Sequence, residues 1–149
     1  MSDDQISVNS NVRVTVIDPD GVDVYRTHNV TCIGGHEAIA QRLAGDGPTV
    51  ASVAVGNDGA SGTSSSNRSL NNQLATVPAN ALDASGNTLA IRAFVPSLLQ
   101  LGAPTNPLDE VGAVVSNGDL LNHATIDRAY LSGTDTVLVV DITITISNA

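Results

Sequence analysis

The chain has 149 residues and a formal net charge of −9, with fifteen acidic residues, six arginines and no lysine. This balance argues against nucleic acid as a partner, because contacts to phosphate need clustered cations and the arginines are scattered along the chain. The lone cysteine, Cys32, excludes an internal disulfide. We expect no membrane span, because no apolar stretch approaches ~20 residues.

Most of the acidic residues are aspartate: only Glu37 and Glu110 are glutamate, and the other thirteen are aspartate. Aspartate in place of lysine removes long apolar stems from the surface. A surface with so much charge of one sign repels itself little in molar salt, where the Debye length shrinks to ~3 Å. Aromatic residues make up only 2% of the chain. This composition is typical of haloarchaeal proteins, and we expect the fold to depend on high salt.

The first ten residues are polar, and we predict a flexible arm over 1–10 followed by a single domain over 11–149. The acidic start, with no apolar run behind it, predicts no signal peptide. Val12, Val14 and Val16 then alternate with polar residues, which indicates a half-buried strand. The sequence DPDG at 18–21 is typical of a turn, so we predict a β-hairpin over 12–27.

The middle of the chain predicts one helix and two strands. Gly34-Gly35 should break the chain before a helix over 36–44, with Glu37 in its first turn and Arg42 in its last. Strands are expected at 50–55 and 88–95. Of the connections, we expect a loop at 56–66, a helical turn at 69–75 and an irregular segment at 96–107.

The last third predicts three strands, at 111–115, 124–131 and 138–147, separated by turns at 117–119 and 133–135. In the final strand, five apolar residues from Leu138 to Ile146 occupy alternate positions. The sequence as a whole predicts an all-β fold, an antiparallel β-sandwich or a jelly-roll-like barrel with one short helix.

We find no pattern that predicts catalysis, a cofactor or a zinc site. A phosphate-binding P-loop needs a lysine, so the glycine-rich segment at 56–62 is interpreted as a surface loop. The sequence has no GxSxG elbow, and His28, His36 and His123 have no metal-ligand spacing. We predict that the protein is not an enzyme.

Two weaker patterns concern binding and modification. Asp18, Asp20 and Asp23 surround a glycine as in the start of a calcium loop, but the rest of the EF-hand pattern is missing. A hairpin turn with solvated acids is the favoured interpretation, and a weak cation site is the alternative. Asn29 and Asn67 begin N-glycosylation sequons and are candidate glycan acceptors.

The order of these elements resembles a group of small β-sandwich structural proteins from the particles of tailed viruses, which includes capsid decorations, tail fibres and baseplate parts. The matching segments are THN at 27–29, GG at 34–35, RLAG at 42–45, VAVGN at 53–57, DEVG at 109–112, LLNHA at 120–124 and DITITIS at 141–147. The likeness covers most of residues 12–147, although each motif is short. The terminal strand lacks its usual aromatic residue, and Val114 replaces an apolar-aromatic pair.

The resemblance implies a virion structural protein of a haloarchaeal tailed virus, assembled in the host cytoplasm. We expect a capsid decoration or turret subunit that forms a trimer or ring and contacts the major capsid protein. The alternative is a tail fibre, tail-tip or baseplate protein that contacts other tail proteins as an adaptor. In a receptor-binding role, the loops at 57–68 and 96–109 would contact a host surface glycan or S-layer.

Overall fold

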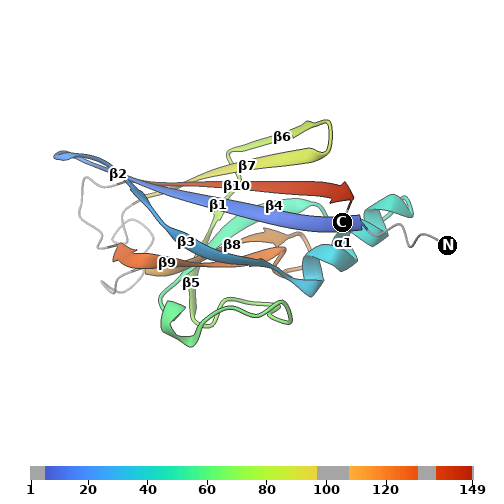
Figure 1. Ribbon diagram of the computed structural model, residues 1–149, viewed down its shortest axis with the longest axis horizontal. Coiled ribbons are helices and arrows are strands. Elements are labelled where there is room, and N and C mark those ends of the chain that lie inside the picture. Colours follow the sequence, from blue (N-terminus) through green and yellow to red (C-terminus); the bar gives the residue numbers. More distant parts are fainter. Residues whose placement is uncertain (1–5, 97–107, 131–136, 149) are drawn as a thin grey trace.

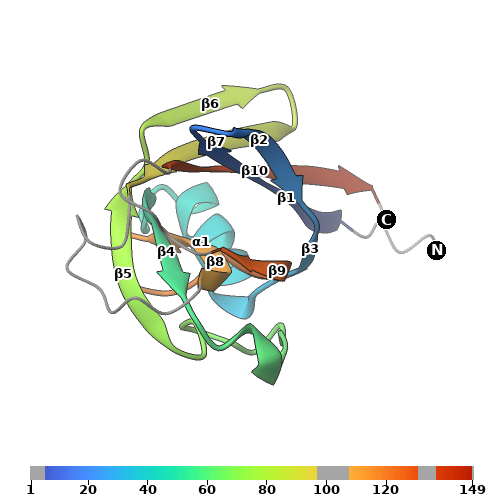
Figure 2. The same cartoon turned by 90° about the vertical axis from the view of Figure 1, so that its left-hand side faces the viewer.

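The computed structural model describes residues 6–96, 108–130 and 137–148. Within these residues, two five-stranded antiparallel sheets pack face to face (Figures 1 and 2). The first sheet consists, in spatial order, of β2 (Gly21–Tyr25), β1 (Ile6–Asp18), β10 (Val137–Asn148), β7 (Thr88–Val95) and β6 (Ala81–Ser85). The second consists of β3 (Thr27–Thr31), β9 (Asn122–Tyr130), β8 (Leu108–Val115), β4 (Val50–Gly56) and β5 (Gln73–Pro78). The predicted all-β sandwich is confirmed.

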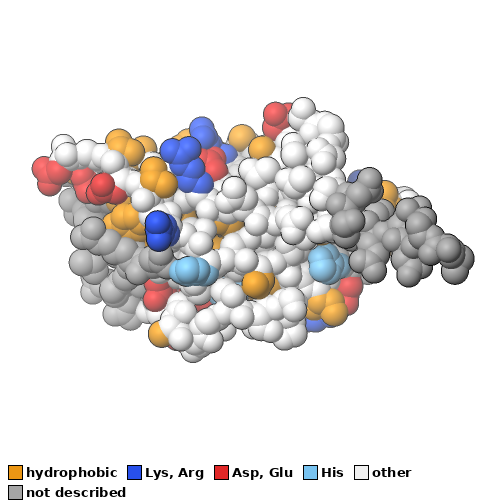
Figure 3. All heavy atoms as spheres, in the orientation of Figure 1, with side chains coloured by type: hydrophobic (Ala, Val, Ile, Leu, Met, Phe, Trp, Pro, Cys, Tyr) orange, Lys and Arg blue, Asp and Glu red, His pale blue; other side chains and the backbone are white. Residues whose placement is uncertain are grey.

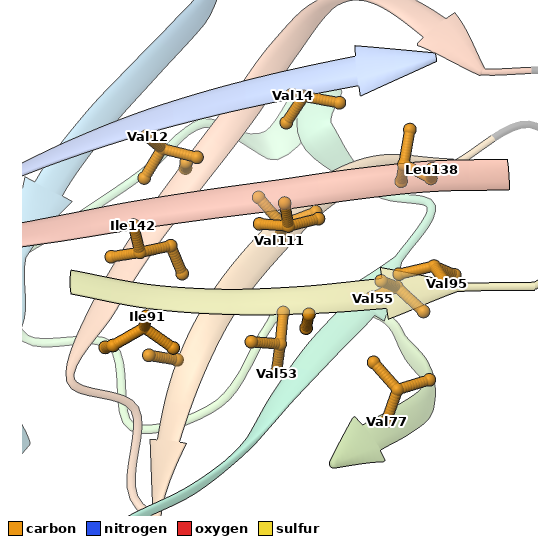
Figure 4. Packing of buried hydrophobic residues seen from close by; sticks show 14 of the residues in the cluster. Val12, Val14, Val53, Val55, Val77, Ile91, Val95, Val111, Leu138 and Ile142 are labelled. Carbon is orange, nitrogen blue, oxygen red and sulfur yellow. The ribbon is translucent and has the colours of Figure 1, made fainter. Parts of the chain in front are cut away.

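The core lies between the two sheets and is built from alternate residues of their strands. Side chains of β1, β7 and β10 face those of β4, β5 and β8 (Figure 4). In β10, Leu138, Val140, Ile142 and Ile144 are buried, as the alternation predicts. Burying each of these side chains stabilises the fold by roughly 1.5–3 kcal/mol.

Helix α1 (Ile33–Leu43) lies at the end of the sandwich opposite the β1–β2 turn (Figure 1). Ala38 joins the main core from this helix. The prediction that Gly34-Gly35 breaks the chain was wrong, because both glycines lie inside the helix. A Cβ on Gly35 would lie 2.6 Å from the Leu121 carbonyl oxygen, so glycine allows the helix to approach the 120–121 segment.

The predicted arm at 1–10 was wrong for residues 6–10, which form the beginning of β1. This strand pairs with β10 from Ile6 opposite Asn148 to Ile17 opposite Val137. The long partner strand offers backbone groups to the polar segment, and Val8 packs against the core. Residues 1–5 of the predicted arm lie outside the described residues.

In the middle of the chain one further prediction was wrong and one strand was missed. The helical turn expected at 69–75 is a loop that leads into β5, because Gln73–Pro78 pairs with β4 at the edge of the second sheet. Strand β6 was not predicted; it pairs with β7, and its short sequence has little alternation. The predictions for 97–107 and for the turn at 133–135 fall outside the described residues.

Candidate functional site

The loop at 57–72, which joins β4 to β5, covers the outer face of the second sheet (Figure 1). It contains one short 3₁₀ turn, η1 (Gly59–Ser61). Beneath it lies a small apolar cluster, separate from the main core, formed by Cys32, Ala54, Leu70, Val114 and Leu120. Leu70 is the member that the loop contributes, so this side chain fixes the loop to the sheet.

Glycines on the outer face of the second sheet allow the covering segments to approach closely. A Cβ on Gly56 would collide with the carbonyl oxygen of Asn72 and would lie 2.7 Å from Oε2 of Glu110. A Cβ on Gly112 would collide with the carbonyl oxygen of Asn122. Gly56 therefore makes room for Glu110 and the end of the loop, and Gly112 makes room for the 120–122 segment.

The central polar group is the carboxylate of Glu110 on β8, which is fully buried between the sheet and the loop. Its Oε2 accepts hydrogen bonds from the backbone N–H groups of Asp58 at 2.9 Å and Asn72 at 3.0 Å. Its Oε1 accepts one from the backbone N–H of Asn71 at 2.8 Å and lies 2.9 Å from Nε2 of His123. One side chain thus binds both ends of the 57–72 loop.

The second buried group is His123 on β9, which is also fully inaccessible to solvent. Its Nδ1 lies 2.9 Å from Oδ1 of Asn67. That oxygen also accepts the backbone N–H of Ser64 at 2.8 Å, so it acts as an acceptor toward the ring as well. Both ring nitrogens of His123 therefore face oxygen atoms within hydrogen-bond distance.

The environment keeps the Glu110 carboxylate ionised. Burial alone raises its pKa, but the hydrogen bonds from His123 and from the three backbone N–H groups outweigh this effect and lower the pKa to about 2. Glu110 is therefore a buried carboxylate, and Nε2 of His123 lies against it. Both nitrogens of His123 are hydrogen-bonded within the protein, and the ring does not contact solvent.

A second polar connection runs from β1 to β8 through two asparagines. The Nδ2 of Asn29 donates to the backbone oxygen of Ser10 at 2.7 Å, and its Oδ1 accepts from Nδ2 of Asn122 at 3.0 Å. The Oδ1 of Asn122 in turn accepts the backbone N–H of Ala113 at 2.9 Å. Asn122 is fully buried, so these bonds replace the water that its amide group loses.

Arg68 connects the outer side of the loop to two neighbouring elements. It forms a two-point contact with Glu37 on α1, with nitrogen–oxygen distances of 3.0 and 2.9 Å. It also lies 2.9 Å from Oδ2 of Asp119, which follows β8. The hydrogen bond from Arg68 lowers the pKa of Glu37. These groups are partly exposed, so they orient the loop more than they stabilise it.

The remaining surface of the loop presents small polar groups to solvent. Its exposed residues are Ala60, Ser61, Gly62, Ser64, Ser65, Ser66, Arg68, Ser69, Asn71 and Asn72. Several of these side chains are already bonded within the loop, for example Ser61 to Asp58 at 2.7 Å. The arrangement provides a preorganised polar surface.

The three aspartates of the first turn are not grouped as a cation site. Oδ1 of Asp18 accepts the backbone N–H groups of Asp20 at 2.9 Å and Gly21 at 3.0 Å, which caps the turn. Asp23 lies on β2 opposite Val16. Among the described residues, no group of three or more histidine, cysteine or acidic side chains is placed to hold a metal ion.

The two predicted glycan acceptors have side chains directed into the protein. The Nδ2 of Asn29, the atom to which a glycan would be attached, is bonded to β1. The Oδ1 of Asn67 is bonded to Ser64 and His123. Glycosylation at either position stays a prediction; at Asn29 the acceptor nitrogen is itself bonded to the backbone of β1, whereas at Asn67 the bonded atom is the amide oxygen.

The other noted residues are placed as follows. His36 is exposed on α1, and His28 lies on β3. Cys32 is fully buried, and burial raises the pKa of its thiol to about 11. No helix in the described ranges is both long and apolar enough to cross a membrane.

The role of Glu110 was not predicted from the sequence. Two signals were available: glutamate is rare in this aspartate-rich chain, and Glu110 stands beside the apolar run that begins at Val111. A charged residue next to such a run is rarely buried unless it is paired. Its partners come from three separate segments, which no local pattern reveals.

Comparison with known proteins adds no relative, because no protein-family model, curated protein or solved structure matches the chain.

Proposed function

We propose that the chain is a structural subunit of a virus particle, a capsid decoration or turret protein of a haloarchaeal tailed virus that assembles as a homo-oligomer. The observation that carries the proposal is the use of the buried Glu110–His123 pair to fix an exposed polar loop on a rigid sandwich. The pair holds structure and leaves no free base. A preorganised polar surface on a small sandwich suits attachment to a regular shell.

Two sequence features also support the proposal. The acidic, lysine-free composition suits a particle exposed to molar salt. The order of motifs resembles that of small virion proteins, as described above. Neither feature depends on the other.

A tail fibre, tail-tip or baseplate role is the second candidate. The exposed loop favours it, because serine and asparagine side chains are suited to hydrogen bonding with a host glycan. Such a protein would occur in few copies per particle, whereas a shell decoration would occur in many.

Counting copies tests the proposal and separates the two candidates. Particles of the encoding virus would be purified on a density gradient at high salt, and the chain would be quantified against the major capsid protein by mass spectrometry. A ratio near one chain per capsid subunit or per few subunits is expected. A handful of copies per particle would favour the tail, and absence from purified particles would refute a virion role.

A further inference from the structure

The outer face of the first sheet carries a cluster of exposed hydrophobic side chains. Nine large hydrophobic residues are exposed in the described part of the chain, and five of them lie on this one face. We call these five residues, together with Val139, which lies between them and is only 7% exposed, the outer patch. Its members are Ile17, Val22, Val24, Phe94, Val137 and Val139.

Strand pairing brings the members of the outer patch together. Val22 is opposite Ile17, which is opposite Val137, and these three form one row across β2, β1 and β10. In the next row, Val24 and Val139 flank Thr15, and Phe94 lies beside Val139. The patch therefore crosses four adjacent strands. Figure 3 shows hydrophobic side chains gathered over the β1–β2 end of the molecule, beside a cluster of charged ones.

The charged groups next to the patch, a row of three with Asp83 in the following row, are balanced, unlike the chain as a whole. Arg13 is opposite Asp141, which is opposite Arg92. Asp141 contacts Nε of Arg92 at 2.6 Å. Asp83 lines the same shallow hollow on this face, so two arginines stand against two aspartates. Two copies of a chain with net charge −9 repel each other in general, but they can meet here without bringing like charge together.

The size of the face is adequate for a dimer. Four strands spaced ~4.8 Å apart and five rows of outward side chains ~6.8 Å apart cover about 600 Å² per copy. Two copies would bury about 1,200 Å², the lower end of the range for specific interfaces. The remaining rows carry threonine and asparagine and would form the polar rim.

We propose that the outer face of the first sheet, centred on the outer patch, is the surface through which two copies of this chain pair face to face. The two-fold axis runs roughly along the strands, so the outer patch meets its counterpart and the charged row meets the charged row. The inference deepens the proposed function and rests on its expectation that the chain contacts copies of itself. It also specifies two-fold pairing as the unit from which a larger assembly would be built.

The test is the mass of the purified protein in 3 M KCl, measured by sedimentation equilibrium up to about 100 μM. The wild-type chain should have twice the 15.2 kDa mass of one chain. The double variant Val22→Asp/Val24→Asp should raise the dissociation constant by about 100-fold, because it places like charges in the contact. Both valines are more than half exposed, at 64% and 54%, so the variant should still fold.

Leu43→Asp is the matched control, because Leu43 is 84% exposed on α1, away from this face. It should remain a dimer. The milder variant Val22→Thr/Val24→Thr keeps β-branched side chains and adds no charge, and it should weaken pairing by a smaller factor. Circular dichroism in the same salt would confirm that each variant is folded.

The proposal would be overturned by a wild-type monomer at 100 μM, by a dimer that the aspartate variant leaves intact, or by a dimer that only Leu43→Asp disrupts. A wild-type trimer would contradict two-fold pairing. Each of these results concerns the interface alone. Detection of the chain in purified particles would still support the virion role, and its absence would refute that role whatever the mass in solution.

Discussion

Replacing Glu110 by glutamine removes one buried charge. It also replaces one carboxylate oxygen, which accepts hydrogen bonds, with an NH₂ group, which donates them. If the glutamine oxygen takes the place of Oε1, its NH₂ group faces the backbone N–H groups of Asp58 and Asn72, and two buried donors lose their acceptor. Each unsatisfied buried group costs about 1–3 kcal/mol. Nε2 of His123 would also face a neutral amide oxygen in place of a carboxylate, which weakens that hydrogen bond. These overlapping costs lead us to expect a loss of about 4 kcal/mol.

Urea denaturation in 3 M KCl, followed by circular dichroism, would measure the free energy of unfolding of Glu110→Gln. The melting temperature should fall by about 12 °C, since about 1 kcal/mol corresponds to roughly 3 °C in a domain of this size. Glu37→Gln is the matched control, because it removes the same charge from the partly exposed contact with Arg68. Glu37→Gln should lower the free energy of unfolding by only a small fraction of the loss caused by Glu110→Gln. Equal effects of the two substitutions would refute the view that Glu110 holds the loop.

Three further outcomes are expected. Because the folded protein lowers the pKa of Glu110 to about 2 from an ordinary value of 4.5, the stabilisation is complete above pH 4.5 and is lost as the pH falls toward 2; acid titration should show a loss of about 3 kcal/mol that is absent in Glu110→Gln. Ile142→Asp should destabilise the fold by more than about 4 kcal/mol and Thr143→Asp by less than about 1 kcal/mol, because only Ile142 is buried; similar urea midpoints would mean that the facing of β10 is wrong. Far-UV circular dichroism should show loss of β-structure on transfer to dilute buffer, and a fully retained signal would contradict the halophilic interpretation.

The sequence predicted those elements whose signal is local. The final strand is the clearest case, because its alternation from Leu138 to Ile144 matches buried positions of β10; Ile146 near its end is 37% exposed, and Val139 is buried on the other face. The β1–β2 turn was equally predictable from the sequence, since Asp18 caps it with its own side chain. In both places the residues that decide the structure are neighbours in the chain.

The errors have a common cause in contacts between distant segments. Ile6 and Val8 continue the alternation of the valines at 12–16, but Ser10 interrupts it, and the pairing of residues 6–10 with β10 extends the strand through this gap. Gly34 and Gly35 would be helix breakers in isolation, but here they allow α1 to approach residues 120–121. Leu70 and Leu74 have helical spacing, yet Leu70 packs beneath the loop and Leu74 lies in β5.

The candidate site was the least predictable part for the same reason. Glu110 binds groups from residues 58, 71, 72 and 123, and only the folded chain brings them together. The sequons were visible in the sequence, but the use of Asn29 and Asn67 as internal hydrogen-bonding groups was not. A polar side chain in a serine-rich segment gives no local sign of whether it faces solvent or protein.

The most direct test of the proposed function is the position of the chain on the virus particle. Intact particles kept in high salt would be labelled with a gold-tagged antibody raised against the folded protein and examined by electron microscopy. We predict gold distributed over the head. Gold confined to the tail or its tip would contradict the decoration role in favour of the tail alternative, and particles without gold, whether intact or gently opened, would contradict a virion role altogether.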